Sequence, residues 1–527
     1  MKDTAFPELE GDDEAITAFM ENSIAITQAA LCDEGFEADV QEIADIIERP
    51  DNLGALRQRG EWHYNFHRSA EHPRGLWRRL AVSQVPEAGA GWESVFDLDA
   101  FCTETGGDWH WNGVRTLHSN PERVLIALSY QGSDQNRYLE WDCTAAAPVP
   151  GGFDLAPARG NAEWLDADSL LVSTADLPGA ATRSGWQGRT VRLTRGTALV
   201  DAPVVFEVDY EDLVASAYTF PLADGSRGVG FARVRNIGDV VTTVEMAGAQ
   251  TTIKAPPNTD CAHNDTHYAF VAGDKGSYPA GTLVLGRIGG GDRQVLFSPS
   301  TRCAVDEGSL IFYRNHLFWL ESDTMVPTIM RLDLRSPDAR PAPLPLPVNA
   351  EEIWLAPHSD PDGDDGPLQL TTSGFLSPSR TWLFDGTAVD PVYELLVSSP
   401  ASFDATGMEV RLHMARSEDG TEVPYHIVLP KGYENSSVLP ILQYGYGGFS
   451  AALAPRYLRT EGPLWLARGG AYVMAYIRGG SEFGRSWHFA AKREYRKNAY
   501  SDFASIADDL VARGYTSPNK IACHGSS

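Results

Sequence analysis

The sequence has few basic residues for its length, few cysteines and no long apolar run. Its 43 Lys and Arg residues face 71 Asp and Glu residues, which gives a net charge of −28 over 527 residues. Such a charge repels phosphate groups, so it argues against nucleic acids and anionic membranes as partners and is most simply explained by solubility. No apolar run reaches the roughly 18 residues that a membrane-spanning helix needs.

The six cysteines are scattered along the chain without close pairs. This spacing favours free thiols over a disulfide framework or a zinc site. The N-terminus is acidic and has no basic region followed by an apolar run, so the sequence shows no secretory signal. We therefore expect a cytoplasmic protein.

The chain is too long for a single hydrophobic core, and its pattern of apolar, polar and turn residues changes along its length. Residues 1–72 are expected to be helical and to pack on another part of the protein, because Ile16, Phe19 and Met20 follow helical spacing. Residues 73–401 contain short β-rich runs between turn residues, a pattern typical of a sandwich, a barrel or a propeller. This region of about 320 residues, at roughly 40–45 residues per blade, would make about seven blades.

Two stretches of this middle region have features of a metal site. Residues 360–366 begin like a calcium loop, but Asp365 stands where the glycine is required and Thr371 where the bidentate Glu is required. His263 and His267 are four residues apart, but no helical pattern carries them and no third ligand is evident. We expect a solvated loop and packing histidines, with no metal and no organic cofactor.

From about residue 402 onward, strands alternate with helices, which predicts a mostly parallel sheet. An Asp-Gly turn at 419–420 predicts a hairpin. Strands at 439–444 and 471–477 each run into a glycine-rich loop. A helix is expected to begin at an N-cap, Ser501, with Asp502 in its first turn. Its apolar stripe comprises Phe503, Ile506, Ala507, Leu510 and Val511.

The last residues predict a nucleophile elbow, in which a buried strand leads directly into Gly525-Ser526-Ser527. The elbow needs a small residue two positions before the nucleophile, because the backbone folds closely on itself. Gly525 meets this need if Ser527 is the nucleophile, whereas Ser526 would place His524 there. We therefore assign Ser527.

A serine nucleophile also needs a base for its proton and donors for the oxyanion of the tetrahedral intermediate. The glycine-rich loop 445–448 follows the earlier strand, and its Tyr446 carries a phenol donor. From spacing alone, a tight turn with a packed tyrosine explains this loop equally well.

The stretch 439–527 resembles the catalytic domain of the prolyl oligopeptidase family of serine peptidases. The resemblance rests on long motifs in family order, which end at the elbow: Tyr444-Gly445-Tyr446-Gly447-Gly448-Phe449, Ile477-Arg478-Gly479-Gly480-Ser481-Glu482-Phe483-Gly484, Trp487-His488, Asp502-Phe503 and Gly514-Tyr515-Thr516-Ser517-Pro518.

The resemblance implies two parts. An α/β-hydrolase domain would be built from both ends of the chain, residues 1–72 and 402–527, and a seven-bladed β-propeller, residues 73–401, would be inserted between them. The propeller would admit only short peptides to the active site.

The resemblance also implies roles for single residues. Ser527 would be the nucleophile, the Tyr446 hydroxyl an oxyanion donor, and Phe449 part of the pocket for the residue before the cleaved bond. The residue before the nucleophile is commonly glycine in the family, and we expect the small Ser526 to be tolerated.

The catalytic Asp and His follow the nucleophile in this family, so neither lies within these 527 residues. His488 and His524 are poor substitutes, because one is a motif position with a structural role and the other lies on the elbow strand. We expect a further segment or a second chain to supply the rest of the hydrolase domain with both residues.

These observations predict a serine peptidase that hydrolyses short peptides, after proline as the first expectation, through an acyl-enzyme on Ser527. An acylaminoacyl peptidase, an isopeptidase or an esterase of the same fold is the alternative. A non-catalytic propeller scaffold that binds a partner is a third hypothesis, and it predicts no reaction with serine-directed inhibitors.

Overall fold

The computed structural model describes residues 13–526 apart from 50, 88–90, 258, 260, 301, 337, 360–365 and 435–437. Most of the calcium-like loop and the predicted nucleophile Ser527 therefore lie outside the described residues. The chain divides into two units, Met1–Arg49 and Pro50–Ser527.

The first unit contains two helices, α1 (Asp13–Leu31) and α2 (Phe36–Ile47), which coincide with the helical spacing of apolar residues. The predicted helical segment is wrong for residues 56–67, which form strands β1 (Leu56–Arg59) and β2 (Trp62–His67). The sequence of β2 alternates aromatic residues (Trp62, Tyr64, Phe66) with polar ones (His63, Asn65, His67), which is the period of a strand, and four of its six side chains are buried.

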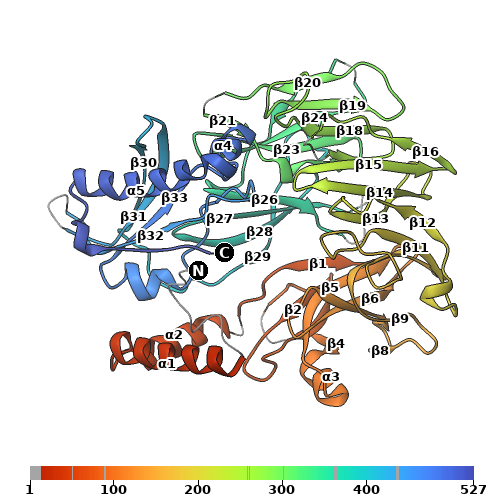
Figure 1. The fold of residues 1–527 in the computed structure, drawn as a ribbon, viewed down its shortest axis with the longest axis horizontal. Helices are drawn as coiled ribbons and strands as arrows, with labels where there is room; N and C mark the ends of the chain where they lie inside the picture. The colour runs from red at the N-terminus through yellow and green to blue at the C-terminus, as the bar shows by residue number, and fades with distance from the viewer. Residues whose placement is uncertain are drawn as a thin grey trace, which may run out of the picture. The chain divides into compact units, whose positions relative to one another are not determined.

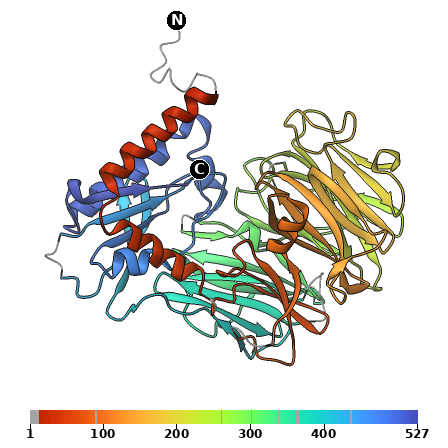
Figure 2. The ribbon, with the colours of Figure 1, turned by 90° about the horizontal axis from the view of Figure 1, so that it is seen from below.

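The strands from β1 to β29 form six hydrogen-bonded sheets, visible from the red to the teal part of the ribbon in Figures 1 and 2. Consecutive strands pair in antiparallel fashion within each sheet, which is the pattern of propeller blades. The first sheet adds β3 (Leu76–Ala81) and β4 (Glu93–Asp97), and α3 (Leu98–Thr105) follows it.

The second sheet has eight strands: β5 (Trp109–Leu117), β6 (Asn120–Tyr130), β7 (Gln135–Asp142), β8 (Ala147–Pro148), β9 (Asp154–Asp166), β10 (Ser169–Thr174), β11 (Arg189–Thr194) and β12 (Val204–Glu207). The other four sheets have four or five strands each. The third sheet contains β13 (Val214–Pro221), β14 (Arg227–Asn236), β15 (Asp239–Met246) and β16 (Ala249–Thr252), and the fourth contains β17 (Cys261–His263), β18 (His267–Val271), β19 (Leu283–Arg287) and β20 (Gln294–Phe297). The fifth contains β21 (Cys303–Val305), β22 (Ile311–Tyr313), β23 (His316–Asp323), β24 (Val326–Asp333) and β25 (Ala342–Pro343), and the sixth contains β26 (Glu352–Pro357), β27 (Leu368–Gly374), β28 (Ser377–Phe384) and β29 (Glu394–Ser398).

The prediction of a β-propeller is confirmed, but the prediction of seven separate blades is wrong for the described strands. Five of the six sheets have the size of one blade, and the sixth is continuous through β9. The first half of β9 pairs with β7 and its second half pairs with β10, so one long strand joins two groups of four strands.

The first and last of these sheets meet edge to edge. The backbone N–H of Gln58 donates to the carbonyl oxygen of His358 at 3.2 Å, and Gln58 forms a parallel bridge with Ser359. The guanidinium of Arg57 also donates to the carbonyl oxygen of Pro357 at 2.8 Å. These bonds close the ring of sheets.

A separate mixed sheet follows, in the order β30-β31-β33-β32-β34. The Asp-Gly turn joins β30 (Glu409–Arg416) and β31 (Glu422–Leu429) as predicted, whereas β32 (Ile441–Gly445), β33 (Ala471–Ala475) and β34 (Ile521–His524) run parallel to one another. A π-helical turn (Gly462–Leu466) precedes β33, and the helices α4 (Arg485–Phe489) and α5 (Lys497–Ala512) follow it.

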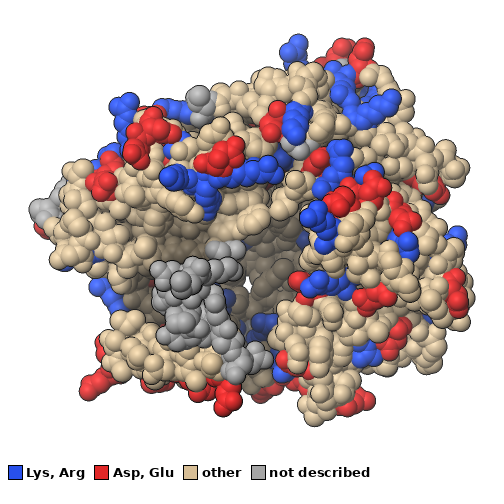
Figure 3. Space-filling view, viewed as in Figure 1, with Lys and Arg blue, Asp and Glu red and all other residues tan. Residues whose placement is uncertain are grey.

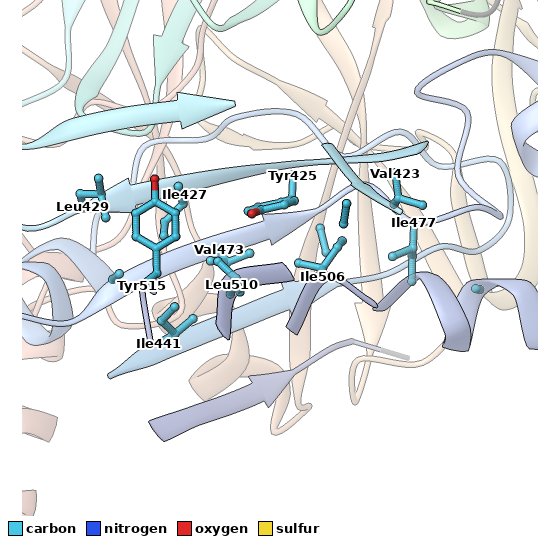
Figure 4. Packing of buried hydrophobic residues seen from close by; sticks show 14 of the residues in the cluster. Val423, Tyr425, Ile427, Leu429, Ile441, Val473, Ile477, Ile506, Leu510 and Tyr515 are labelled. Atoms are coloured by element: carbon cyan, nitrogen blue, oxygen red, sulfur yellow. The ribbon is translucent and has the colours of Figure 1, made fainter. Parts of the chain in front are cut away.

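Strands and helix α5 bury one apolar core beside this sheet (Figure 4). Ile506 and Leu510 of α5 are fully buried and lie close to Val473 of β33 in Figure 4. These two residues belong to the apolar stripe that predicted the helix.

Two local expectations for this region are wrong. Helix α5 begins at Lys497, four residues before the expected N-cap Ser501, and Asp502 inside it is buried against another side chain. Strand β34 was expected to be buried, but Ala522, Cys523 and His524 are exposed because β34 is the edge strand of the described sheet.

None of the helices within the described residues has both the length and the apolar character needed to cross a membrane. On the face shown in Figure 3, acidic and basic side chains are interspersed. This face therefore shows no broad patch of one sign.

Candidate active site

The predicted oxyanion loop and the predicted elbow leave the mixed sheet at the same edge. Strands β32 and β34 are parallel neighbours, with Gln443 opposite Cys523 and Tyr444 opposite His524. A Cβ atom on Gly525 would lie 3.0 Å from the carbonyl oxygen of Gly445. The chain that follows β34 therefore starts in close contact with the chain that follows β32, at the carboxyl ends of parallel strands.

The loop after β32, residues 445–450, is here called the first glycine loop. Gly447, Phe449 and Ser450 all have positive φ, at 60°, 54° and 58°. Two consecutive non-glycine residues in the left-handed region cost free energy, so the loop must be held by its surroundings.

The segment after β33, residues 478–484, supplies that support and is called the second glycine loop. The carbonyl oxygen of Gly479 accepts a hydrogen bond from the Ser450 backbone N–H at 3.2 Å. The Ser481 hydroxyl donates to the carbonyl oxygen of Ser450 at 2.7 Å. The two loops are therefore one fastened unit.

Glycine is required where the two loops touch. Gly479 has φ of 108°, and a Cβ atom there would lie 2.1 Å from the carbonyl oxygen of Gly447. The Arg496 guanidinium donates to that same oxygen. A side chain at position 479 would push the first glycine loop away.

The Arg478–Asp502 ion pair anchors the second glycine loop to helix α5. Both side chains are buried, and the Asp502 carboxylate also accepts from the backbone N–H of Arg478 at 2.9 Å and from the Ser417 hydroxyl at 2.6 Å. Asp419 accepts from the other side of the guanidinium, and this hydrogen bond lowers the pKa of Asp419 to about 2.

The sequence placed Arg478 and Asp502 in motifs without assigning them a role. The two residues are 24 positions apart in the sequence, and only the folded sheet and helix bring them together. The only signal for these residues in the sequence was that each belongs to one of the motifs shared with the family.

Tyr446 and Phe449 both project from the first glycine loop. Tyr446 is half-buried, and Phe449 is 64% exposed. Phe449 lines a cavity of about 450 Å³ together with Gly238 and Glu307 of the propeller sheets. An aromatic ring is thus presented to a space between the propeller and the mixed sheet.

The two histidines near the site have contacts within the protein. The Nδ1 atom of His488 donates to the carbonyl oxygen of Gly479 at 2.8 Å, and burial lowers its pKa. The ring of His524 packs on Tyr444, with centroids 4.8 Å apart. His488 therefore supports the glycine loops, as its motif position predicted.

One group of described residues has the spacing of metal ligands: His72, Asp97 and Asp99. The carboxylate of Asp97 accepts from the N–H of Ala100 as a helix cap, and that of Asp99 accepts from the N–H of Gly75. These contacts give both carboxylates a structural role in the first sheet.

The two histidines of the middle region also make protein contacts. The Nε2 atom of His263 lies 2.6 Å from the Tyr218 hydroxyl, and the Nδ1 atom of His267 lies 2.9 Å from the Thr266 hydroxyl. These contacts fit the expected packing role.

Similarity to known proteins adds to this geometry. The model of a family described as the prolyl oligopeptidase family matches residues 457–527, which include the second glycine loop and the predicted elbow. An uncharacterized peptidase of Sinorhizobium fredii is 29% identical over 491 residues, covering 88% of this chain and 65% of its own length. An uncharacterized peptidase of Rickettsia prowazekii is 25% identical over 568 residues, covering 100% of this chain and 76% of its own length.

A solved structure described as a post-proline cleaving enzyme from Rickettsia typhi has a TM-score of 0.89. Its sequence identity is 22%, and the match covers 100% of this chain and 79% of that chain. At this identity the likeness shows the fold, which combines the ring of sheets with the mixed sheet. The present chain thus spans about two thirds to four fifths of the length of these proteins.

Proposed function

The chain belongs to the prolyl oligopeptidase family, and we propose that it acts as a serine peptidase that hydrolyses short peptides through an acyl-enzyme on Ser527. The observation that carries this proposal is the contact between Gly525 and Gly445 at one edge of the sheet. This closeness supports an oxyanion role for the first glycine loop, because Gly525 comes two positions before the proposed nucleophile Ser527 in the sequence.

In this mechanism the Ser527 Oγ attacks the carbonyl carbon of the scissile bond while a base takes its proton. The negative charge that develops on the carbonyl oxygen is stabilised by the Tyr446 hydroxyl. The amine then leaves with a proton, and water hydrolyses the ester. We propose that the base is a histidine, paired with an aspartate, in a further segment or a second chain.

We propose that the mixed sheet is part of an α/β-hydrolase domain. Its parallel strands β32, β33 and β34 and the helix α5 support this assignment. The propeller would then restrict access to short peptides, since Phe449 faces a cavity lined partly by propeller residues.

Cleavage after proline is the proposed specificity. The exposed ring of Phe449 suits a flat apolar side chain such as that of proline. The similarity to a structure described as a post-proline cleaving enzyme agrees with this choice.

A panel of chromogenic substrates tests the proposal. Peptides with proline, with a basic residue and with an acylated N-terminus before the reporter group are compared on the protein and on its Ser527→Ala variant. Serine-dependent turnover led by the proline substrate is the expected result. Turnover led by the acylated substrate would favour an acylaminoacyl peptidase, and turnover that survives in Ser527→Ala would refute the assigned nucleophile.

A further inference from the structure

A second cavity, of about 240 Å³, lies between the propeller and the mixed sheet, and it is strongly acidic. We call it the acidic cavity. Five of its lining residues are acids: Asp306, Glu321, Glu351, Glu352 and Glu482. Its described lining contains no Lys, Arg or His.

Glu482 of the second glycine loop is the most deeply buried of these acids. It is 6% exposed, and its Oε1 atom accepts from the backbone N–H of Leu453 at 2.9 Å. Its Oε2 atom is buried without a hydrogen-bond partner among the described residues. A buried carboxylate oxygen without a partner is costly, so this atom marks a place where a donor is missing.

The charges of three of the carboxylates all raise the pKa of one neighbouring side chain, Tyr476, so the three share one electrostatic environment. Burial, followed by the charges of Glu482 and Glu351 and then that of Glu352, raises the pKa of the Tyr476 phenol. Burial also raises the pKa of Glu482 to about 7. The acidic cavity therefore gains from a positive charge placed inside it.

The other carboxylates are held in place by single hydrogen bonds. Glu351 accepts from the backbone N–H of Phe375 at 2.8 Å, and Glu321 accepts from the indole N–H of Trp319 at 2.8 Å. None of the five acids forms an ion pair with any residue that the structure describes. Their positions are fixed while part of their acceptor capacity is unused.

The lining favours an organic cation over a metal ion. Among the described residues, no three of these carboxylates bring their oxygens within 4.8 Å of one another. Apolar side chains, among them Leu320, Ile353 and Leu453, form much of the remaining surface. Trp354 also lines the cavity, and its ring is already stacked under the Arg57 guanidinium at 5.1 Å. A charged head on an apolar stem fits such a surface.

The acidic cavity adjoins the cavity that Phe449 lines. Asp306, Ala452 and Ser481 belong to both. A peptide held with one side chain against Phe449 could therefore extend a neighbouring group into the acidic cavity.

We propose that the acidic cavity binds a cationic group of the peptide substrate, which is either its free amino terminus or a Lys or Arg side chain. This inference rests on the proposed peptidase function and adds a substrate class to it. Glu482 would provide the deepest acceptor, and Glu321 of β23 and Glu352 of β26 the acceptors on the propeller side.

Binding of fluorescent peptides to the Ser527→Ala variant tests this proposal. One proline peptide is made in three forms: acetylated with Lys before the proline, acetylated with norleucine in place of Lys, and with a free amino terminus and norleucine. Fluorescence anisotropy should show about 10- to 100-fold tighter binding for at least one cationic form than for the acetylated norleucine peptide. Tighter binding of the Lys peptide would identify a side chain as the bound cation, and tighter binding of the peptide with a free amino terminus would identify that terminus.

Glu482→Gln, made in the same background, should remove most of that preference while Glu409→Gln, on the exposed start of β30, keeps it. If Glu482→Gln does not fold, as judged by circular dichroism, Glu321→Gln and Glu352→Gln replace it. Equal affinities for all three peptides, or a preference that survives every folded cavity variant, would overturn the proposal. Because the readout is binding, a preference in a protein that hydrolyses nothing would reject the peptidase and leave the cation site standing.

Discussion

The guanidinium of Arg478 and the carboxylate of Asp502 form a two-point contact, with Nη2 to Oδ1 at 2.7 Å and Nε to Oδ2 at 2.9 Å. Both side chains are buried, with Asp502 at 0% exposure. Planar, bidentate pairs of this kind are strong and geometrically specific. The pair joins the second glycine loop to α5 and so positions the residues that contact the first glycine loop.

Asp502→Asn should lower the free energy of unfolding by about 3 kcal/mol, because it removes a negative charge that pairs with the buried guanidinium of Arg478. Asp508→Asn, an exposed position on the same helix, is the matched control and should change it by less than about 0.5 kcal/mol. Urea unfolding of both variants measures the difference. Equal stabilities would show that the pair does not anchor the loop.

Gly479→Ala should impair activity and stability together. The new Cβ atom would lie 2.1 Å from the carbonyl oxygen of Gly447. Gly469 is a matched control, because its φ is 90° and a Cβ atom there would have no atom within 4 Å. Gly469→Ala should cost only the backbone penalty of about 1 kcal/mol and keep kcat. Similar kcat values for the two variants would argue against a role for the loop contact.

Tyr446→Phe should reduce kcat by roughly 10- to 1000-fold with a smaller effect on KM, because an oxyanion donor acts mainly in the transition state. Tyr495→Phe, at an exposed position, serves as the control. Steady-state kinetics with the best proline substrate provide the measurement. An unchanged kcat would make Tyr446 a packing residue.

Glu482 should make stability depend on pH. Burial raises its pKa from the ordinary 4.5 to about 7, so the folded state binds this proton more tightly than the unfolded state. The bound proton contributes about 3 kcal/mol to the free energy of unfolding. This contribution is present in full below pH 4.5 and is lost as the pH rises through 7.

The Tm of Glu482→Gln relative to that of the parent protein should therefore rise between pH 5 and pH 8.5, measured without peptide. Tyr476, Glu351 and Glu352 share this environment and stay unchanged in the comparison. Glu409→Gln should show no such trend. A Tm difference for Glu482→Gln that does not vary with pH would mean that this carboxylate is not the buried acid described above.

The sequence predicted the parts of the fold that depend on local patterns. The Asp-Gly hairpin, the two glycine-rich loops after β32 and β33 and the apolar stripe of α5 all appear where they were expected. Residues 56–67 were predicted wrongly although the aromatic residues of β2 alternate with polar ones, which is the period of a strand. The polar residues His63, Asn65 and His67 are buried as well, so both faces of this strand are covered.

Features that depend on distant partners could not be predicted. Asp502 resembled a residue of the first helical turn, but its partner Arg478 fixes its role. The acidic cavity combines Glu482 with Glu321 and Glu351, which lie more than a hundred residues away in the sequence. Only the folded chain brings such side chains together.

The most direct test of the account is reaction with a fluorophosphonate probe, followed by mass spectrometry of the tryptic peptides. The account predicts one adduct per chain, on Ser527, that is absent from Ser527→Ala and present in Ser526→Ala. Fluorophosphonates label only serines that are activated as nucleophiles, so the site of the adduct identifies the catalytic residue. No adduct, or an adduct on Ser526 or another serine, would contradict the proposed peptidase mechanism.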